Sequence, residues 1–233
     1  MGARDVLTSD ALIVCEGTSD EAFFHAFIEA RGLPPFCVRV TGDSGRGAGN
    51  GHFGDFLEAL ASWKQFPAVR NIILVSDNDG NAKQSFKNVR DQVVAVRPER
   101  DPPVSFPAPS RACQTAAGAP AVTIIMLPWR GRRGCLETLC LPAAQQANAR
   151  SPAASSCVDR FAACVGTESW PPSKLAKMKL QAMLSAQHRK NPALGLSNVW
   201  RDGTGLIPLD HECFDDLHEF LSRIPVEVLT VPR

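Results

Sequence analysis

The first half of the chain alternates between continuous apolar runs and stretches with the features of helices. Four runs are apolar almost throughout and have the length of buried strands: residues 11–16, 36–41, 71–76 and 121–127. Three intervening stretches are predicted to be helices: residues 18–31, 53–65 and 81–96. Continuous apolar strands separated by helices are typical of a parallel sheet covered on both faces. The pattern therefore predicts an α/β fold.

After residue 127 the pattern changes to helices alone. Four helices are expected in this part: residues 134–142, 151–165, 173–190 and 211–224. We expect an α/β core over residues 1–130 and a helical C-terminal extension over residues 131–233, packed on the core. Residues 97–120 are rich in Pro, Ser and Ala, which predicts a long flexible or lid-like surface loop within the core.

Composition places limits on the partners of the chain. Hydrophobic residues make up 44% and charged residues 21% of its 233 residues, with a formal net charge of +1. That charge argues against adhesion of the whole surface to nucleic acid or membranes, so a basic surface must be local. No apolar run approaches the roughly 18 residues of a membrane span, and the N-terminal residues lack a signal-peptide pattern. We expect a cytoplasmic protein with no membrane partner.

Eight cysteines are present, but none forms a Cys-x-x-Cys pair, and several lie within apolar runs. Cysteine is often a small buried apolar residue, and a cytosolic setting disfavours disulfides. We therefore expect structural thiols and no zinc site.

Acidic residues stand at the ends of two predicted strands. Glu16 ends the first strand, and Asp77 and Asp79 follow the third. Carboxyl ends of parallel strands share one edge of the sheet, and neighbouring strands lie roughly 4.8 Å apart. If the two strands are neighbours, the three carboxylates repel one another unless a cation neutralises them. Oxygen ligands of this kind favour Mg²⁺ or Mn²⁺.

Two other interpretations stay open. A strand-end aspartate can simply cap the next helix, and a receiver-like or nucleotide-binding fold places acids similarly. The glycine-rich stretch around Gly45, Gly47 and Gly49 follows the second strand, whereas a dinucleotide fingerprint follows the first. We expect a mobile loop beside the sheet edge, with Arg46 and His52 as candidate substrate contacts.

The segment IVCEGTSDEAFF, followed by a strand and SDNDG, resembles the TOPRIM domain of topoisomerases, bacterial primases and several nucleases. Residues 1–127 match that domain in the order of their elements. The resemblance to the overcoming-lysogenization-defect nucleases implies a second acid four positions after Glu16, which is Asp20. The tail, including GCLE, is similar to a small stand-alone prokaryotic TOPRIM-like family.

The resemblance implies a TOPRIM-like or Rossmann-like core with a metal site. Glu137 lies just after the fourth strand and is a candidate ligand, although it can also be a solvated helix residue. Glu16, Asp77 and Asp79 are the implied catalytic residues. The implied ligands of Mg²⁺ or Mn²⁺ are Glu16, Asp20, Asp77, Asp79 and Glu137.

Basic residues near the same edge are candidate phosphate contacts. Arg130, Arg132 and Arg133 lie together in PWRGRRG, and Lys174 and Lys177 share one face of a later helix. A solvated charged face is the other interpretation of these clusters. With a net charge near zero, these residues form the surface expected to bind DNA or RNA.

Together these patterns predict a metal-dependent phosphodiesterase, a nuclease acting on DNA or RNA. The chain contains no tyrosine, which excludes a covalent tyrosyl-phosphate within it and favours hydrolysis by water. The alternative is a non-catalytic TOPRIM-like subunit that binds a nucleotide or a partner in a larger complex, such as a phage-defence system. Assembly with another protein or a second copy of the chain is left open.

Overall fold

The computed structural model describes residues 6–101, 103–129, 131–147, 153–188 and 190–229. Its sheet has the strand order β2-β1-β3-β5-β4, with β4 antiparallel to β5 and the other neighbouring pairs parallel. The strands are β1 (Ala11–Cys15), β2 (Cys37–Val40), β3 (Asn71–Asp77), β4 (Thr115–Ala116) and β5 (Ala121–Leu127). The predicted α/β class is confirmed.

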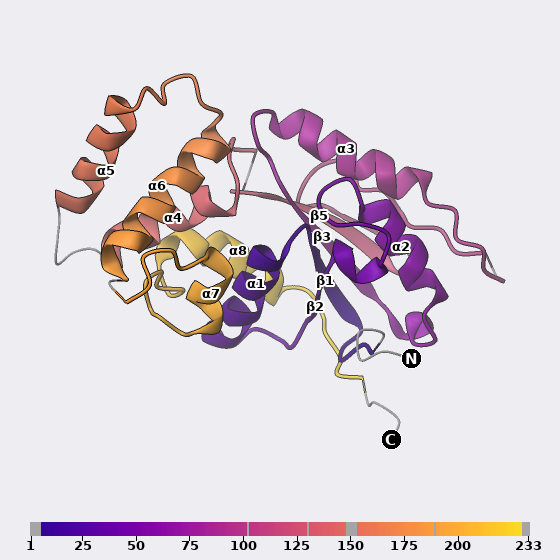
Figure 1. The fold of residues 1–233 in the computed structure, drawn as a ribbon. Helices are drawn as coiled ribbons and strands as arrows, with labels where there is room; N and C mark the ends of the chain where they lie inside the picture. Colours follow the sequence, from indigo (N-terminus) through magenta and orange to yellow (C-terminus); the bar gives the residue numbers. More distant parts are fainter. Residues whose placement is uncertain (1–5, 102, 130, 148–152, 189, 230–233) are drawn as a thin grey trace.

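Helices cover both faces of this sheet (Figure 1). One face packs against α2 (Phe53–Ser62) and α3 (Ala82–Ala95), and the other against α1 (Thr18–Ala30) and the C-terminal helices. Successive residues of a strand enter different cores: Ile13 packs on the α1 side and Val14 on the α2 side. Because both faces are buried, these strands are continuously apolar.

The C-terminal half adds helices around α1. They are α4 (Leu136–Ala147), α5 (Ala153–Cys164), α6 (Pro172–Gln187), α7 (Leu196–Arg201), the 3-10 helix η5 (Glu212–Phe214) and α8 (Asp215–Ser222). In this layer α4 and α5 pack on α6, and α7 packs on α1. An aromatic cluster of Phe23, Phe27, Trp200 and Phe214 joins α1 to α7 and η5. Within the described ranges, no helix is long and apolar enough to cross a membrane.

Three local features differ from the sequence expectations. The segment 97–120, expected as a flexible loop, carries β4 and buries Phe106 against Phe66, with ring centroids 5.9 Å apart. Helix α4 continues through Pro142 to Ala147, where a helix end was expected. Helix α7 was not predicted because it is too short to show a periodic apolar pattern. Its buried residues Val199 and Trp200 stabilise it by packing.

Candidate metal centre

The first acid of the site, Glu16, is oriented by the neighbouring strand. Strands β1 and β3 are adjacent, with Cys15 opposite Val75, so Glu16 lies level with Ser76. The Oε1 atom of Glu16 accepts hydrogen bonds from the Ser76 hydroxyl and, at 3.1 Å, from the Asp77 amide. Both bonds fall on Oε1. Among the described residues, Oε2 makes no hydrogen bond and stays available for a ligand or a proton.

Asp77 links the end of β3 to the start of α4. Its Oδ1 atom accepts a hydrogen bond from the Leu136 amide at 3.1 Å. The alternative that Asp77 or Asp79 caps the next helix is not what the structure has, because Asn81 caps α3 by accepting from the Gln84 amide at 3.1 Å. Asp77 instead satisfies a backbone donor of α4, a helix far along the chain.

Asp79 holds the loop after β5 in place through its backbone. Its φ is +47°, its amide donates to the Gly134 carbonyl at 2.7 Å, and its carbonyl accepts from the Gly134 amide at 2.9 Å. This antiparallel bridge brings the start of α4 next to the SDNDG motif. It explains how Glu137, in the first turn of α4, reaches the acids of β3.

Three potential metal ligands lie close together. One ligand atom each from Asp77, Cys135 and Glu137 falls within 4.8 Å of the others. The sequence predicts a structural thiol at Cys135 and gives no sign of a ligand there. Cys135 is fully buried, its Sγ lies 3.6 Å from the Ser173 carbonyl oxygen, and burial raises its pKa. The thiol thus remains protonated in the absence of a metal.

Burial and mutual repulsion raise the pKa of three acids in this group. Desolvation is the largest cause for Glu16, whose hydrogen bonds from Ser76 and Asp77 act in the opposite direction. Burial, then Glu16 and Glu137, raise the pKa of Asp20 to about 7. Burial and the neighbouring acids raise the pKa of Asp77 well above its ordinary value. We call Glu16, Asp20, Asp77, Asp79 and Glu137 the acid cluster.

Lys177 of α6 carries a positive charge that acts on this cluster. Partial burial lowers its pKa, but the carboxylates of Glu137 and Asp77 outweigh burial and raise it overall. The Lys177 charge also lowers the pKa of Glu16 and Asp77. Lys174, expected beside it as a phosphate contact, is exposed one turn earlier on α6. The helical extension therefore contributes directly to the electrostatics of the site.

The predicted arginine loop is only partly described. Arg130 lies outside the described residues, and Arg132 and Arg133 are exposed. The backbone carbonyl of Arg132 accepts a hydrogen bond from Asn78 Nδ2 at 2.7 Å, which fixes the loop against the β3–α3 turn. Both guanidinium groups are thus carried by a loop that is anchored beside the acid cluster.

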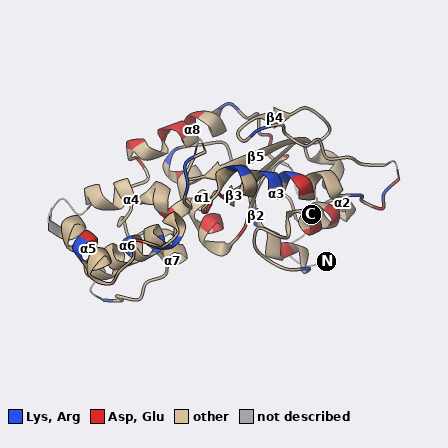
Figure 2. Ribbon diagram, turned by 90° about the horizontal axis from the view of Figure 1, so that it is seen from above, with Lys and Arg blue, Asp and Glu red and all other residues tan. Residues whose placement is uncertain are grey.

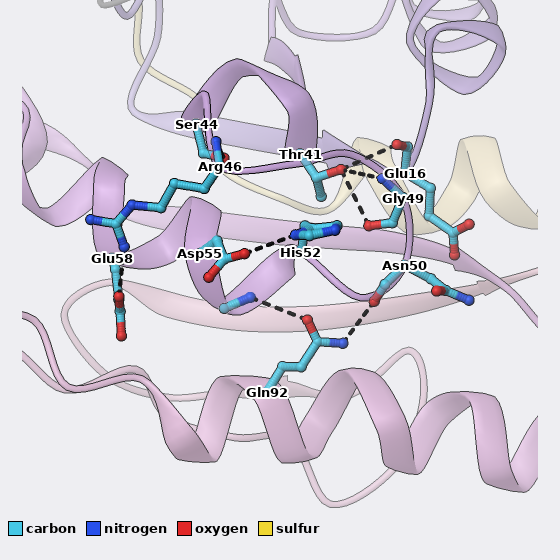
Figure 3. A network of polar contacts seen from close by, with 11 residues as sticks. Glu16, Thr41, Ser44, Arg46, Gly49, Asn50, His52, Asp55, Glu58 and Gln92 are labelled. Carbon is cyan, nitrogen blue, oxygen red and sulfur yellow. Dashed lines mark hydrogen bonds and ion pairs between the residues drawn. The ribbon is translucent and has the colours of Figure 1, made fainter.

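The glycine-rich loop is attached to the backbone of Glu16 (Figure 3). The Thr41 hydroxyl and the Gly49 amide both donate to the Glu16 carbonyl at 3.2 Å. The candidate substrate contacts have partners within the protein: Arg46 pairs with Glu58, and His52 Nδ1 lies 2.8 Å from Asp55 Oδ2. The loop expected to be mobile therefore has fixed attachments at the sheet edge.

Gly134 offers a test of how the loop positions α4. Its φ is +131°, and a Cβ atom there would lie 2.3 Å from Thr138 Oγ1. We expect Gly134→Ala to lower stability by roughly 1–3 kcal/mol, because a non-glycine residue is strained in this backbone conformation. Chemical denaturation measures the loss. The control is Gly80→Ala, where a Cβ meets nothing within 4 Å; equal effects of the two substitutions would contradict this account.

The pKa of Asp20 predicts a pH dependence of stability in metal-free protein. Its folded pKa of about 7 lies above the ordinary 3.8, so the native state binds the proton more tightly. The resulting stabilisation is complete below pH 3.8 and is lost as the pH rises to about 7. We therefore expect Asp20→Asn to become increasingly more stable than wild type over that range. A difference in melting temperature between variant and wild type that stays constant from pH 4 to pH 8 in EDTA would contradict the raised pKa of Asp20.

A family model described as "Protein of unknown function (DUF3226)" matches residues 10–225, so the chain belongs to this family. No curated protein and no solved structure matches the chain. The family description names no reaction, so the chemistry of the acid cluster is the basis for proposing a function.

Proposed function

We propose that this member of the DUF3226 family is a divalent-metal-dependent phosphodiesterase that cleaves DNA or RNA. The observation that carries the proposal is the convergence of four half-buried carboxyl groups, from the end of β1, from α1, from β3 and from α4. Burial and the neighbouring acids raise the pKa of three of them, Glu16, Asp20 and Asp77. Unpaired acids in such a place are destabilising. A protein keeps such an arrangement where a cation binds.

The donor atoms fit Mg²⁺ or Mn²⁺. Carboxylate oxygens are the ligands that these hard cations take, whereas a thiol is not an ordinary ligand of Mg²⁺. We assign Asp77 and Glu137, with Asp20, Glu16 and Asp79 around them, as the residues that would hold the metal. When bound, the metal supplies positive charge that stabilises negative charge developing on the phosphate oxygens.

The residues of the chain itself supply orientation and proton transfer. Glu16 is held through Oε1, so its Oε2 keeps a fixed direction from which it can ligate or accept a proton. Lys177 carries a positive charge into the acid cluster, where it suits a phosphate oxygen of the substrate. The likeness of the Glu-Gly and Asp-x-Asp-Gly motifs to TOPRIM nucleases agrees with these roles.

A cleavage assay tests the proposal directly. Labelled single-stranded and double-stranded DNA and RNA are incubated with the protein while Mn²⁺ or Mg²⁺ is titrated. We expect cleavage that requires the metal and stops in EDTA. Binding without cleavage would favour the alternative, a non-catalytic nucleotide- or partner-binding subunit, and the absence of both would contradict a role in nucleic-acid chemistry.

A further inference from the structure

A groove lies outside the acid cluster, beside the β3–α3 turn, and is formed mainly by α3 and residues 110–112. We call it the α3 groove. Its volume is about 1030 Å³. It is lined by α3, by residues 110–112, by Asn78 and by the loop at residues 131–133. Five of its lining residues are basic: Lys83, Lys87, Arg90, Arg111 and Arg133. Figure 2 shows the concentration of Lys and Arg along α3.

The positive charge of the α3 groove is largely unneutralised. No Asp or Glu of the described chain lines it. Lys87 pairs with Asp91 at 2.5 Å, but Lys83, Arg90, Arg111 and Arg133 form no ion pair with any described residue. The Nε atom of Arg90 is buried without a hydrogen-bond partner among those residues. On a chain with a net charge of +1, such a concentration indicates an anionic ligand.

Asn78 lines the α3 groove and anchors the loop that carries Arg133. Its side chain is fully buried, and its Nδ2 donates to the Arg132 carbonyl at 2.7 Å. That bond fixes Oδ1 as the free atom of the amide, and Oδ1 is buried with no partner in the described structure. A buried acceptor of this kind requires an N–H or O–H donor.

The remaining lining suits a nucleotide unit more than a bare anion. Phe86 and Met126 contribute apolar surface, and Gln84 contributes an amide. Aromatic side chains that stack bases beside a basic path are typical of sites for single strands. The volume is at the upper end of the range for small-ligand pockets, about 1,000 Å³.

The α3 groove and the acid cluster share a wall. Asn78 stands between Asp77 and Asp79 in the chain, and the loop that supplies Arg133 to the groove is bonded to Asp79 through Gly134. The groove therefore ends beside the C-terminal end of β3, the strand that carries Asp77.

We infer that the α3 groove binds a single-stranded segment of nucleic acid and leads it to the acid cluster. The guanidinium and ammonium groups of the groove contact its phosphates. This inference rests on the proposed function for its direction, because it names the path of the substrate to that site.

The test measures binding without cleavage. A fluorescein-labelled single strand of about 15 nucleotides is titrated in EDTA and followed by anisotropy. Both Lys83 and Arg111 are exposed, so the double variant Lys83→Glu/Arg111→Glu is expected to fold, which its melting curve verifies. The matched control is Lys64→Glu/Arg70→Glu, two exposed residues that are not part of the groove lining.

We expect the groove variant to bind the strand at least about tenfold more weakly and its salt slope to fall by about 1.4, since each lost phosphate contact removes about 0.7. The control should retain the wild-type affinity. Equal affinities of wild type and groove variant, equal losses in the two variants, or tighter binding of a duplex than of the single strand would overturn the inference. Tighter binding of a free mononucleotide than of the strand would also overturn it.

These outcomes are separable from those of the metal site. Strand binding in EDTA needs no metal, so it can persist where Mn²⁺ neither stabilises the protein nor supports cleavage. Conversely, metal binding with unchanged strand affinity in the groove variant would contradict the groove alone.

Discussion

Millimolar Mn²⁺ is expected to raise the melting temperature of the wild-type protein, and Asp77→Asn is expected to remove most of that rise. A ligand at about 100 times its Kd stabilises the native state by about 2.7 kcal/mol. For a domain of this size, that corresponds to roughly 5–10 °C. Asparagine keeps an oxygen that can accept from the Leu136 amide, so the variant tests the charge of Asp77 more than the helix contact. Differential scanning fluorimetry in EDTA and in Mn²⁺ gives the measurement.

The matched control for this experiment is Asp91→Asn. Asp91 is an exposed acid of α3 whose partner is Lys87, and it does not belong to the acid cluster. It should show the wild-type response to Mn²⁺. A response of the same size in the Asp77 variant would mean that the metal binds elsewhere, and no response in wild type would contradict the candidate metal centre.

The strands were predictable because both faces of the sheet are buried. Residues 121–127 are apolar at every position except Thr123, and the structure has β5 at those bounds. Register was not predictable, since an apolar run carries no signal of its neighbour. The adjacency of β1 and β3, on which the position of Glu16 depends, is a property of the folded sheet.

Only part of the site could be predicted from the sequence, because the sequence does not show which elements become neighbours in the fold. Glu16 and Asp77 are predictable from the sequence because an acid at the end of an apolar strand is unusual. Cys135 carries no such signal, because buried cysteines are common; only the bridge between Asp79 and Gly134 brings it near Asp77. The spacing of Lys83 and Lys87 on one helix face was a usable signal for the α3 groove, but Arg111 reaches the groove through tertiary packing alone.

Asp77 has two roles, although neither is capping of the helix that follows it in the chain. It accepts a backbone hydrogen bond at the start of α4, as a capping residue does, and it lies within the acid cluster, as a metal ligand does. A stability measurement on Asp77 alone therefore mixes both roles. Glu16 separates them better, because its partners Ser76 and Asp77 belong to the neighbouring strand and not to a helix end.

Glu16→Gln is expected to lower metal-dependent cleavage by about 10²-fold or more, the scale of a general acid–base contribution. It should leave the metal-free protein as stable as wild type or more stable. The reason is that burial and the charge of Asp79 raise the pKa of Glu16, which means that its ionised form is disfavoured in the native state. Glutamine removes that charge and keeps an oxygen for the Ser76 hydroxyl and the Asp77 amide.

Cleavage rate and chemical denaturation, measured on the same preparation of Glu16→Gln, distinguish catalysis from support of the fold. A purely structural glutamate predicts the reverse pair of results: stability reduced by roughly 1 kcal/mol, the scale of one lost hydrogen bond, and cleavage retained. Glu29→Gln serves as the control, because Glu29 is exposed near the end of α1 and outside the acid cluster. A destabilised Glu16 variant with the cleavage rate of the Glu29 control would exclude Glu16 from the reaction.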